Sequence, residues 1–395
     1  MSTTTTLYNF DDLDLQGKRA FIRVDFNVPI ENGAVTDDSR IRAHLPTIGA
    51  VLAKGGSVIL GSHLGRPKGK PSPEFSLEPV AAALGALLEK EVKFCPDCVG
   101  EQARELAAAL QPGEVLLLEN LRFHAEEEAN DEAFGKQLAA LADVYINDAF
   151  ATAHRAHAST DAAPRAAAQK AAGKLLCEEV DYLQKSFSVP QRPLVAIIGG
   201  AKISSKIGVL EALVGKVDRL LIGGAMANTF LGALGMEVGA SLVETDQYDT
   251  ANEVLAAARA REVLVELPRD LVCQGPGGGS ATVGATYLNA SLAALDIGPH
   301  TRARFATLIA DAGTVIWNGP MGMFEKSPYD EGTLAVARAV AQCQGLTIAG
   351  GGDTLAALNR LHLSDAIDHL STGGGAFLEW IEGKALPGVE ALRKG

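Results

Sequence analysis

Short apolar runs alternate with longer segments of helical spacing along most of this chain. Each apolar run leads into a turn of glycine or polar residues, and then into a stretch whose apolar residues recur every three to four positions. This alternation predicts β-α-β units, in which helices cover both faces of a parallel sheet. The predicted strands are 20–24, 58–60, 92–94, 115–118, 144–146, 194–198, 219–222, 263–267, 314–317, 347–349 and 369–371, and the predicted helices of the first half are 41–53, 79–89, 100–110 and 132–141.

The two series of strands predict an α/β fold with two doubly wound parallel-sheet domains. Between them, the segment 175–190 has the pattern of an amphipathic helix that proline ends. We therefore expect an N-terminal domain at 1–174, a helical hinge at 175–190 and a C-terminal domain at 191–382. The length of 395 residues agrees with two domains, because a single hydrophobic core seldom grows that large.

Basic residues follow four predicted strands of the first half. Ligands of parallel sheets bind beyond the carboxyl ends of the strands, and arginine forks bind carboxylate and phosphate there. A single arginine is explained as simply by a surface salt bridge, but four strand ends together predict a site for a small polyanion. Metal binding by the histidines is disfavoured, because no HxH or HExxH spacing occurs and arginines repel a dication. The residues concerned are Arg23, His63, Arg66, Arg122, His154, Arg155 and His157.

Glycine follows the predicted strands of the second half. Of the 42 glycines, 13 precede Pro190 and 29 follow it. Glycine lets backbone N–H groups approach a phosphate closely where a helix begins. We expect Lys202 and Lys206 to share one face of a helix there, and Asp353 to hold Mg²⁺ beside a polyphosphate. The clusters are 199–200, 223–224, 318–320, 350–352 and 373–375, whereas 275–279 lies well beyond its strand and is interpreted as a plain loop.

Charge and cysteine content narrow the classes of protein. The formal net charge of −13 disfavours a surface for nucleic acid or anionic lipid. The sequence has no apolar segment near the roughly 18 residues of a membrane span and no signal peptide pattern, so we expect a cytoplasmic protein. Five cysteines, odd in number, indicate reduced thiols.

Cys95 and Cys98 form a CxxC pair. A zinc site would need a second pair or nearby histidines, which the sequence does not place beside it. A thioredoxin-like redox role stays open, but we interpret the pair as the end of a strand that turns into a helix.

A polyanion site in one domain and a phosphate site in the other indicate a two-substrate phosphoryl transferase that closes and excludes water. The phosphate loops lack GxxxxGK[ST], which disfavours a P-loop NTPase. They also lack GxGxxG, which disfavours a dehydrogenase. An acceptor carboxylate is already ionised, so transfer to it requires positioning and charge neutralisation but no general base.

Nearly the whole chain, from about Gly17 to Gly388, resembles the phosphoglycerate kinase family. The resemblance implies reversible transfer of the acyl phosphate of 1,3-bisphosphoglycerate to Mg-ADP, giving 3-phosphoglycerate and ATP, by a monomeric enzyme. It also implies that the segment 383–395 completes the N-terminal domain. The matching segments are 23–29, 62–67, 118–123, 147–150, 153–157, 199–202, 317–320, 350–354 and 371–375.

Roles for individual residues follow from this resemblance. Asp25 and Asn27 would bind the glycerate hydroxyl region, and His63, Arg66, Arg122 and Arg155 the 3-phosphate. Arg40, expected in a loop, would neutralise the carboxyl end, while Lys202 and the amides of Gly373, Gly374 and Gly375 would stabilise the transferring phosphoryl group. The nucleotide site would comprise Lys206, Gly223, Gly224, Asn318, Glu325 at the ribose, Gly351, Gly352, Asp353 at the magnesium, and Thr354.

Two other hypotheses remain. A non-catalytic regulator that binds nucleotide and anion on the same fold would be expected to have lost some of Arg40, Lys202 and Asp353, all of which are present. An NAD-dependent dehydrogenase would share the α/β class but not the phosphate loops.

Overall fold

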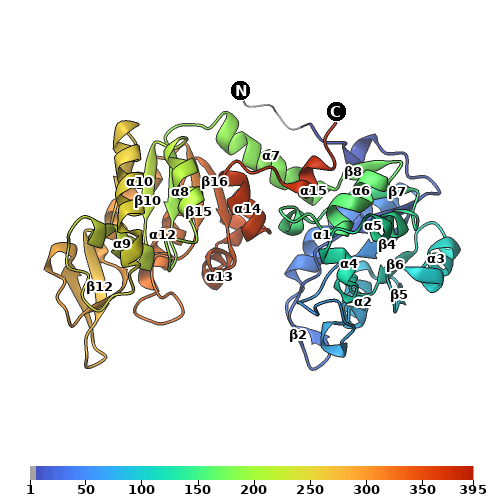
Figure 1. Ribbon diagram of the computed structural model, residues 1–395, viewed down its shortest axis with the longest axis horizontal. Helices are drawn as coiled ribbons and strands as arrows, with labels where there is room; N and C mark the ends of the chain where they lie inside the picture. Colours follow the sequence, from blue (N-terminus) through green and yellow to red (C-terminus); the bar gives the residue numbers. More distant parts are fainter. Residues whose placement is uncertain (1–5, 395) are drawn as a thin grey trace. The chain divides into compact units, whose positions relative to one another are not determined.

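The computed structural model describes residues 6–394, which form two compact units (Figure 1). The first comprises the chain up to Asp181 together with the segment from Ala385, and the second runs from Tyr182 to Lys384. The division falls within α7 (Lys174–Ser188). Each unit contains a parallel sheet with helices, so the predicted α/β class with two parallel-sheet domains is confirmed. The predicted domain boundaries stay predictions.

The sheet of the first unit has the strand order β5-β6-β4-β1-β7-β8, all parallel. Its strands are β1 (Arg19–Arg23), β4 (Ser57–Gly61), β5 (Val92–Cys95), β6 (Val115–Leu118), β7 (Val144–Asn147) and β8 (Lys170–Ala172). All five residues of β4 are buried, as expected of a strand with helices on both faces.

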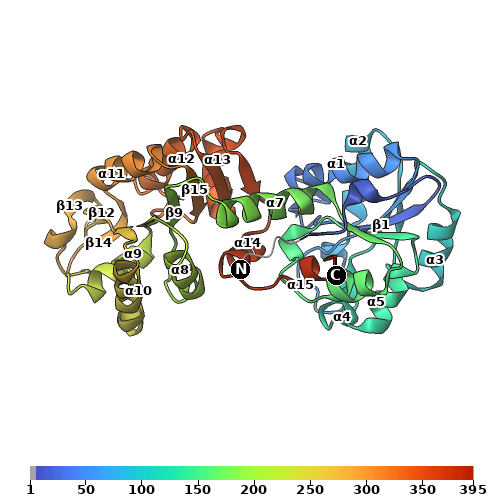
Figure 2. The same cartoon turned by 90° about the horizontal axis from the view of Figure 1, so that it is seen from above.

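Helices cover both faces of this sheet. Figure 2 shows α1 (Ser39–Ala53) and α2 (Glu78–Leu88) on one face, and α4 (Ala125–Glu128) and α5 (Glu132–Ala139) on the other. The unit also contains α3 (Gly100–Ala109), α6 (Ala163–Ala166), and the two-residue strands β2 (Ile30–Glu31) and β3 (Ala34–Val35).

The sheet of the second unit is also parallel, in the order β11-β10-β9-β15-β16-β17. Its strands are β9 (Leu194–Ile198), β10 (Arg219–Ile222), β11 (Leu264–Glu266), β15 (Thr314–Asn318), β16 (Leu346–Gly350) and β17 (His369–Ser371). In Figure 2, α11 (Pro299–Ala310), α12 (Glu331–Ala341) and α13 (Gly352–Arg360) lie on one face, and α8 (Ile207–Val214), α9 (Ala225–Ala233) and α10 (Tyr248–Ala260) on the other. Helix α14 (Gly374–Ile381) follows β17.

A small antiparallel sheet in the second unit was not predicted. It has the order β13-β12-β14, with β12 (Asp270–Gln274), β13 (Ser280–Gly284) and β14 (Ala293–Ile297). Strand β13 reads SATVG and is largely exposed, so no apolar run marks it in the sequence. The glycine-rich 275–279 follows β12 directly and joins it to β13, so it is a loop as expected, but the expectation that it lies well beyond a strand is wrong.

The C-terminal segment packs on the first unit. The N–H of Gly388, in α15 (Pro387–Glu390), donates to the Ala153 carbonyl at 2.9 Å, and the Asn147 amide donates to the Gly388 carbonyl at 3.4 Å. A Cβ at Gly388 would lie 3.0 Å from the Ala153 Cα, so this approach favours glycine. None of the helices within residues 6–394 is both long and apolar enough to cross a lipid bilayer.

Candidate active site

A cluster of buried and half-buried basic side chains lies at the carboxyl ends of β1, β4, β6 and β7. Arg23, the last residue of β1, is fully buried. Its Nε donates to Ser159 Oγ at 2.8 Å, and its Nη2 lies 3.3 Å from His63 Nδ1. We call Arg23, His63, Arg122, Arg155 and His157 the cationic cluster.

Asp25 places a carboxylate beside this cluster. Its Oδ2 accepts a 2.6 Å bond from Arg40 Nη1, and its Oδ1 lies 3.7 Å from His63 Nδ1. Burial by itself would raise the pKa of Asp25. The positive charges of His63 when protonated, of Arg40 and of Arg23 together outweigh burial, so the pKa of Asp25 lies below its ordinary value. Asp25 is therefore ionised and holds the Arg40 side chain.

The two histidines of the cluster are neutral at pH 7. Burial, with Arg122 and Arg23 nearby, lowers the pKa of His157 to about 3. Burial likewise holds the pKa of His63 well below its ordinary value, against the attraction of Asp25. Both rings can therefore donate or accept hydrogen bonds without adding to the positive charge.

Arg122 is a buried member of the cluster with one unbonded donor. It is 5% exposed, and its Nη1 donates to the Gly65 carbonyl at 2.8 Å. Its Nε makes no hydrogen bond, although Glu128 Oε1 lies 3.4 Å away. Burial lowers the pKa of Arg122, and the charges of Arg23 and Arg155 lower it as well, against the opposing attraction of Glu128 and Glu127. An anionic ligand would relieve this repulsion and accept the free N–H.

The other predicted residues of this half differ in their contacts. Asn27 accepts a 2.9 Å bond from the Gly65 N–H, and Arg155 donates to His154 Nε2 at 3.2 Å. Arg66 is exposed. The expectation that Arg40 stands in a loop is wrong, because Arg40 lies in the first turn of α1, from which it reaches Asp25.

In the second unit, Lys206 lies among carbonyl oxygens at the ends of β9 and β15. Its Nζ donates to the Gly199 carbonyl at 2.7 Å and to Asn318 Oδ1 at 2.5 Å. Burial lowers the pKa of Lys206 to about 8, with a smaller opposing effect from Asp353. Lys206 is thus charged at pH 7 and lies near the carboxylate of Asp353.

The expectation that Lys202 and Lys206 share a helical face is wrong. Helix α8 begins only at Ile207, and residues 200–206 form turns in which Lys202 is exposed. Gly200, just after β9, has a φ of +128°, which an L side chain rarely adopts and which no right-handed helix contains. Lys202 is therefore exposed, whereas the ammonium group of Lys206 is bonded to carbonyl oxygens.

Glycines bring the neighbouring loops together. A Cβ at Gly224, whose φ is +70°, would lie 2.5 Å from the Gly200 carbonyl, so only glycine allows this approach. Asn318 Nδ2 donates to the Gly350 carbonyl at 2.7 Å, and Thr354 Oγ1 accepts the Gly319 N–H at 2.8 Å.

Two helices begin in these loops. Gly351 is the N-cap of α13, whose first residue is Gly352, and Gly373 is the N-cap of α14, whose first residue is Gly374. Their first-turn N–H groups have no partner within the helix and attract phosphate. Gly223 follows β10 directly, and Glu325 is exposed beyond β15.

Asp353 fits a magnesium ion that a nucleotide carries. It is exposed in the first turn of α13 and acts electrostatically on Lys206. Within residues 6–394, it belongs to no group of three ligand side chains. Mg²⁺ in nucleotide sites is usually held by one or two carboxylates together with substrate phosphates, and one exposed carboxylate agrees with that donor set.

Arg23 and His157 were predicted for the polyanion site without an individual role, and His44 received no role from the sequence. Arg23 and His157 belong to segments that the strand-end rule singled out, so the signal for them was present. His44 gave no signal, since it lies inside α1. It accepts the Asp25 N–H at Nε2 (2.9 Å), and its Nδ1 donates to Asp148 Oδ2 (2.8 Å).

The profile of the phosphoglycerate kinase family matches residues 10–384. The chain belongs to this family. The phosphoglycerate kinase of Anaeromyxobacter sp. (strain K) is 54% identical over 394 residues, which cover 98% of this chain and 100% of that protein. That of Moorella thermoacetica is 55% identical over 384 residues, covering 96% and 98%. The phosphoglycerate kinase structure from Coxiella burnetii has a TM-score of 0.90 and 42% identity, covering 98% of this chain and 99% of that one.

The predicted family and activity are therefore confirmed. The chain is a kinase of glycolysis, an enzyme that reversibly transfers the acyl phosphate of 1,3-bisphosphoglycerate to ADP, giving 3-phosphoglycerate and ATP. Its substrates are small molecules, and phosphoglycerate kinases generally use ATP or ADP with Mg²⁺. The comparisons do not favour a non-catalytic regulator.

Proposed function

We propose that the cationic cluster binds the phosphoglycerate and that the glycine-rich strand ends of the second unit bind Mg-ADP or Mg-ATP. The observation that carries this assignment is the buried Arg122, which has a free N–H and two further arginines acting on it. A phosphate dianion would accept that N–H and offset two of the three positive charges. An arginine that served only in a surface salt bridge would not need to be buried as Arg122 is.

The phosphoglycerate would be held at both ends. Arg122, Arg155, His63 and Arg66 would bind its 3-phosphate, with the three arginines and the neutral histidine supplying donors from three strand ends. Asp25 and Asn27 would hydrogen-bond the hydroxyl group. Arg40 would carry the positive charge next to the carboxyl group, where its bond to Asp25 already fixes the guanidinium.

The nucleotide would be held mainly by backbone groups. The amides at Gly223, Gly224, Gly351 and Gly352 and the side chains of Asn318 and Thr354 would bind near the phosphates, and Glu325 would bind the ribose. Lys206 supplies a cation at the same strand ends. Bound Mg²⁺, on Asp353, would neutralise charge on the nucleotide phosphates.

Phosphoryl transfer would be direct, because the acceptor carboxylate is already ionised and can attack the phosphoryl group itself. The acceptor carboxylate needs no general base, so catalysis consists of positioning and of charge stabilisation by Arg40, Lys202 and the amides of Gly373, Gly374 and Gly375. We further propose a monomer that acts in the cytoplasm and has neither a nucleic acid nor a membrane as partner.

The role of Arg40 can be tested against Arg42 of the same helical turn. Arg42 is exposed and bonded to Asp38 at 2.8 Å, so Arg42→Ala is a matched control. In a coupled assay with Mg-ATP, 3-phosphoglycerate and glyceraldehyde-3-phosphate dehydrogenase, Arg40→Ala should lower kcat by about 10²- to 10³-fold. The KM for Mg-ATP should stay within roughly twofold, because Arg40 belongs to the other ligand's site. An equal loss in Arg42→Ala, or a loss confined to the KM of Mg-ATP, would contradict this role.

A further inference from the structure

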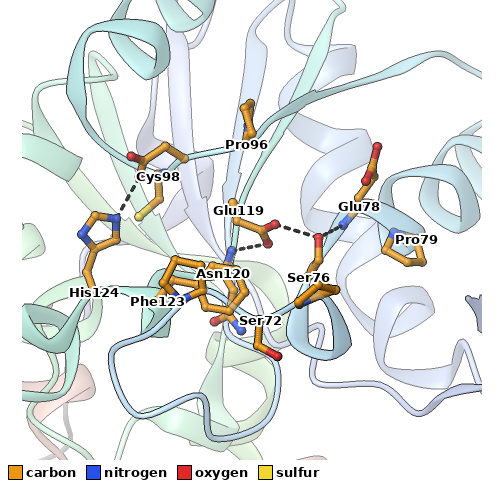
Figure 3. Close-up of a pocket in the computed structure, with 13 residues that line it drawn as sticks. Ser72, Ser76, Glu78, Pro79, Pro96, Cys98, Glu119, Asn120, Phe123 and His124 are labelled. Carbon is orange, nitrogen blue, oxygen red and sulfur yellow. Dashed lines mark hydrogen bonds and ion pairs between the residues drawn. The ribbon is translucent and has the colours of Figure 1, made fainter.

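A cavity of about 680 Å³ lies in the first unit, between the loops that follow β5 and β6. Its lining includes Asp97, Cys98, Glu119 and His124. Figure 3 shows the Cys98 thiol and the His124 ring pointing toward one another at one side of this cavity. Neither residue has a role in the proposed phosphoglycerate site.

Three metal-binding side chains meet here. One ligand atom from each of Asp97, Cys98 and His124 lies within 4.8 Å of the other two, and His124 Nε2 is 2.8 Å from Asp97 Oδ1. The sequence prediction excluded zinc because no histidine stands near the CxxC pair. That reasoning is wrong on this point, because the fold brings His124 beside Cys98 from a different loop.

We propose that Asp97, Cys98 and His124 bind a first-row transition-metal dication of the zinc type, with a water molecule as fourth ligand on the cavity side. A thiolate, an imidazole and a carboxylate are the ligands that Zn²⁺ takes, and three protein ligands with one open position are typical of accessible zinc sites. The cavity supplies both the entry path and the room for water.

The distances require only small side-chain movements. Tetrahedral bonds of the usual zinc lengths separate sulfur, nitrogen and oxygen ligands by roughly 3.3–3.6 Å. The His124–Asp97 pair would open by about half an ångström, and Cys98 would approach both by about 1.2 Å at most. His124 and Asp97 are half-buried, and the cavity leaves them space for this adjustment.

The surroundings of the three ligands also suit a metal. Asp97 Oδ1 accepts the Cys98 N–H at 2.6 Å, and the His124 ring packs 5.2 Å from the Phe134 ring, so both side chains are already oriented. Burial holds the pKa of Cys98 well above its ordinary value, and the negative charges of Asp97 and Glu127 add to this effect. The same charges attract a dication, which would displace the thiol proton.

A redox role for the CxxC pair is less well supported. Cys95 and Cys98 are both free and buried, and burial raises the pKa of each thiol. Reactive thiols have lowered pKa values and some exposure. Cys95 lies outside the three-ligand group, so the metal site needs only one thiol of the pair.

Cobalt titration of the intact, chelator-treated protein, without nucleotide or added magnesium, tests the proposal. Wild type should bind one Co²⁺ with a thiolate-to-cobalt charge-transfer band, and Zn²⁺ should abolish that band. Cys98→Ser should lose the band, and His124→Gln should weaken binding by at least about 100-fold. The Cys95→Ser and Cys177→Ser variants should keep both band and affinity.

Proton release supplies a second readout. Near pH 7, Zn²⁺ binding should release about one proton from the Cys98 thiol in weakly buffered solution, and none in Cys98→Ser. A wild type without a band, a band that persists in Cys98→Ser, or a band lost in Cys95→Ser would overturn the proposed ligand set. If Cys98→Ser fails to fold by circular dichroism, His124→Gln decides the question, and unchanged cobalt affinity in it would refute the site.

Discussion

Lys206 makes nucleotide binding depend on pH in a predictable direction. Burial lowers the pKa of its ammonium group from the usual 10.5 to about 8. In the free enzyme, the charged form predominates at pH 7 and is lost as the pH rises through 8. Bound phosphate favours the ammonium, so the affinity for Mg-ADP should fall over the same range. The β-phosphate itself does not contribute, because phosphate groups complete their ionisation near pH 6.

The size of the change in Mg-ADP affinity follows from the lowered pKa of Lys206. At pH 7 about nine-tenths of Lys206 is charged and at pH 9 about one-tenth, so the Kd for Mg-ADP should rise about tenfold between these pH values. Calorimetry at several pH values measures this rise. At pH 8, binding should also take up about half a proton, which calorimetry in buffers of different ionisation enthalpy detects.

A variant that cannot lose its charge provides the control. Lys206→Arg stays charged throughout, so its Kd should be nearly independent of pH from 7 to 9, whatever its absolute value. A wild-type Kd that stays flat over this range, or a Lys206→Arg variant with the same slope as wild type, would refute the reasoning.

Two further predictions concern buried polar groups. His44→Leu removes the partner of the Asp25 N–H and of Asp148 Oδ2, and should lower the free energy of unfolding by about 2–5 kcal/mol in urea denaturation. His300 is exposed, so His300→Leu should change this free energy little. Equal losses in the two variants would contradict the role of His44. Burial raises the pKa of Asp296 from 3.8 to about 7, so the folded state binds the proton more tightly and stability should fall by up to about 4 kcal/mol as the pH rises from 4 to 7. Asp296→Asn should abolish that slope, and a slope that persists in this variant would exclude Asp296 as its source.

The parallel sheets could be predicted because their strands are buried on both faces. Strand β9 matches its predicted bounds, since five consecutive apolar residues end at a glycine. Strand β8, which reads KAA, and the exposed β13 have no such run, and their pairing depends on neighbours that the local pattern does not reveal.

The candidate site likewise contains residues that the sequence pattern predicted and residues that it did not. Arg122 and His63 were predicted because they follow strands, and a parallel sheet brings strand ends to one edge. Arg40 reaches Asp25 from a helix, so only the family resemblance indicated it. The meeting of Cys98 with His124 depends on how two loops fold against each other, which no spacing along the chain expresses.

The central claim is that different residues, one set in each unit, hold the two substrates. Calorimetry with 3-phosphoglycerate and with Mg-ADP, on wild type, Arg122→Gln and Asp353→Asn, tests it most directly, with the exposed Asp365→Asn as control. Arg122→Gln should weaken 3-phosphoglycerate binding at least about tenfold and leave Mg-ADP unchanged, and Asp353→Asn should do the reverse. If either variant weakened both ligands equally, or if Arg122→Gln left 3-phosphoglycerate binding intact, the assignment of the two sites would be wrong.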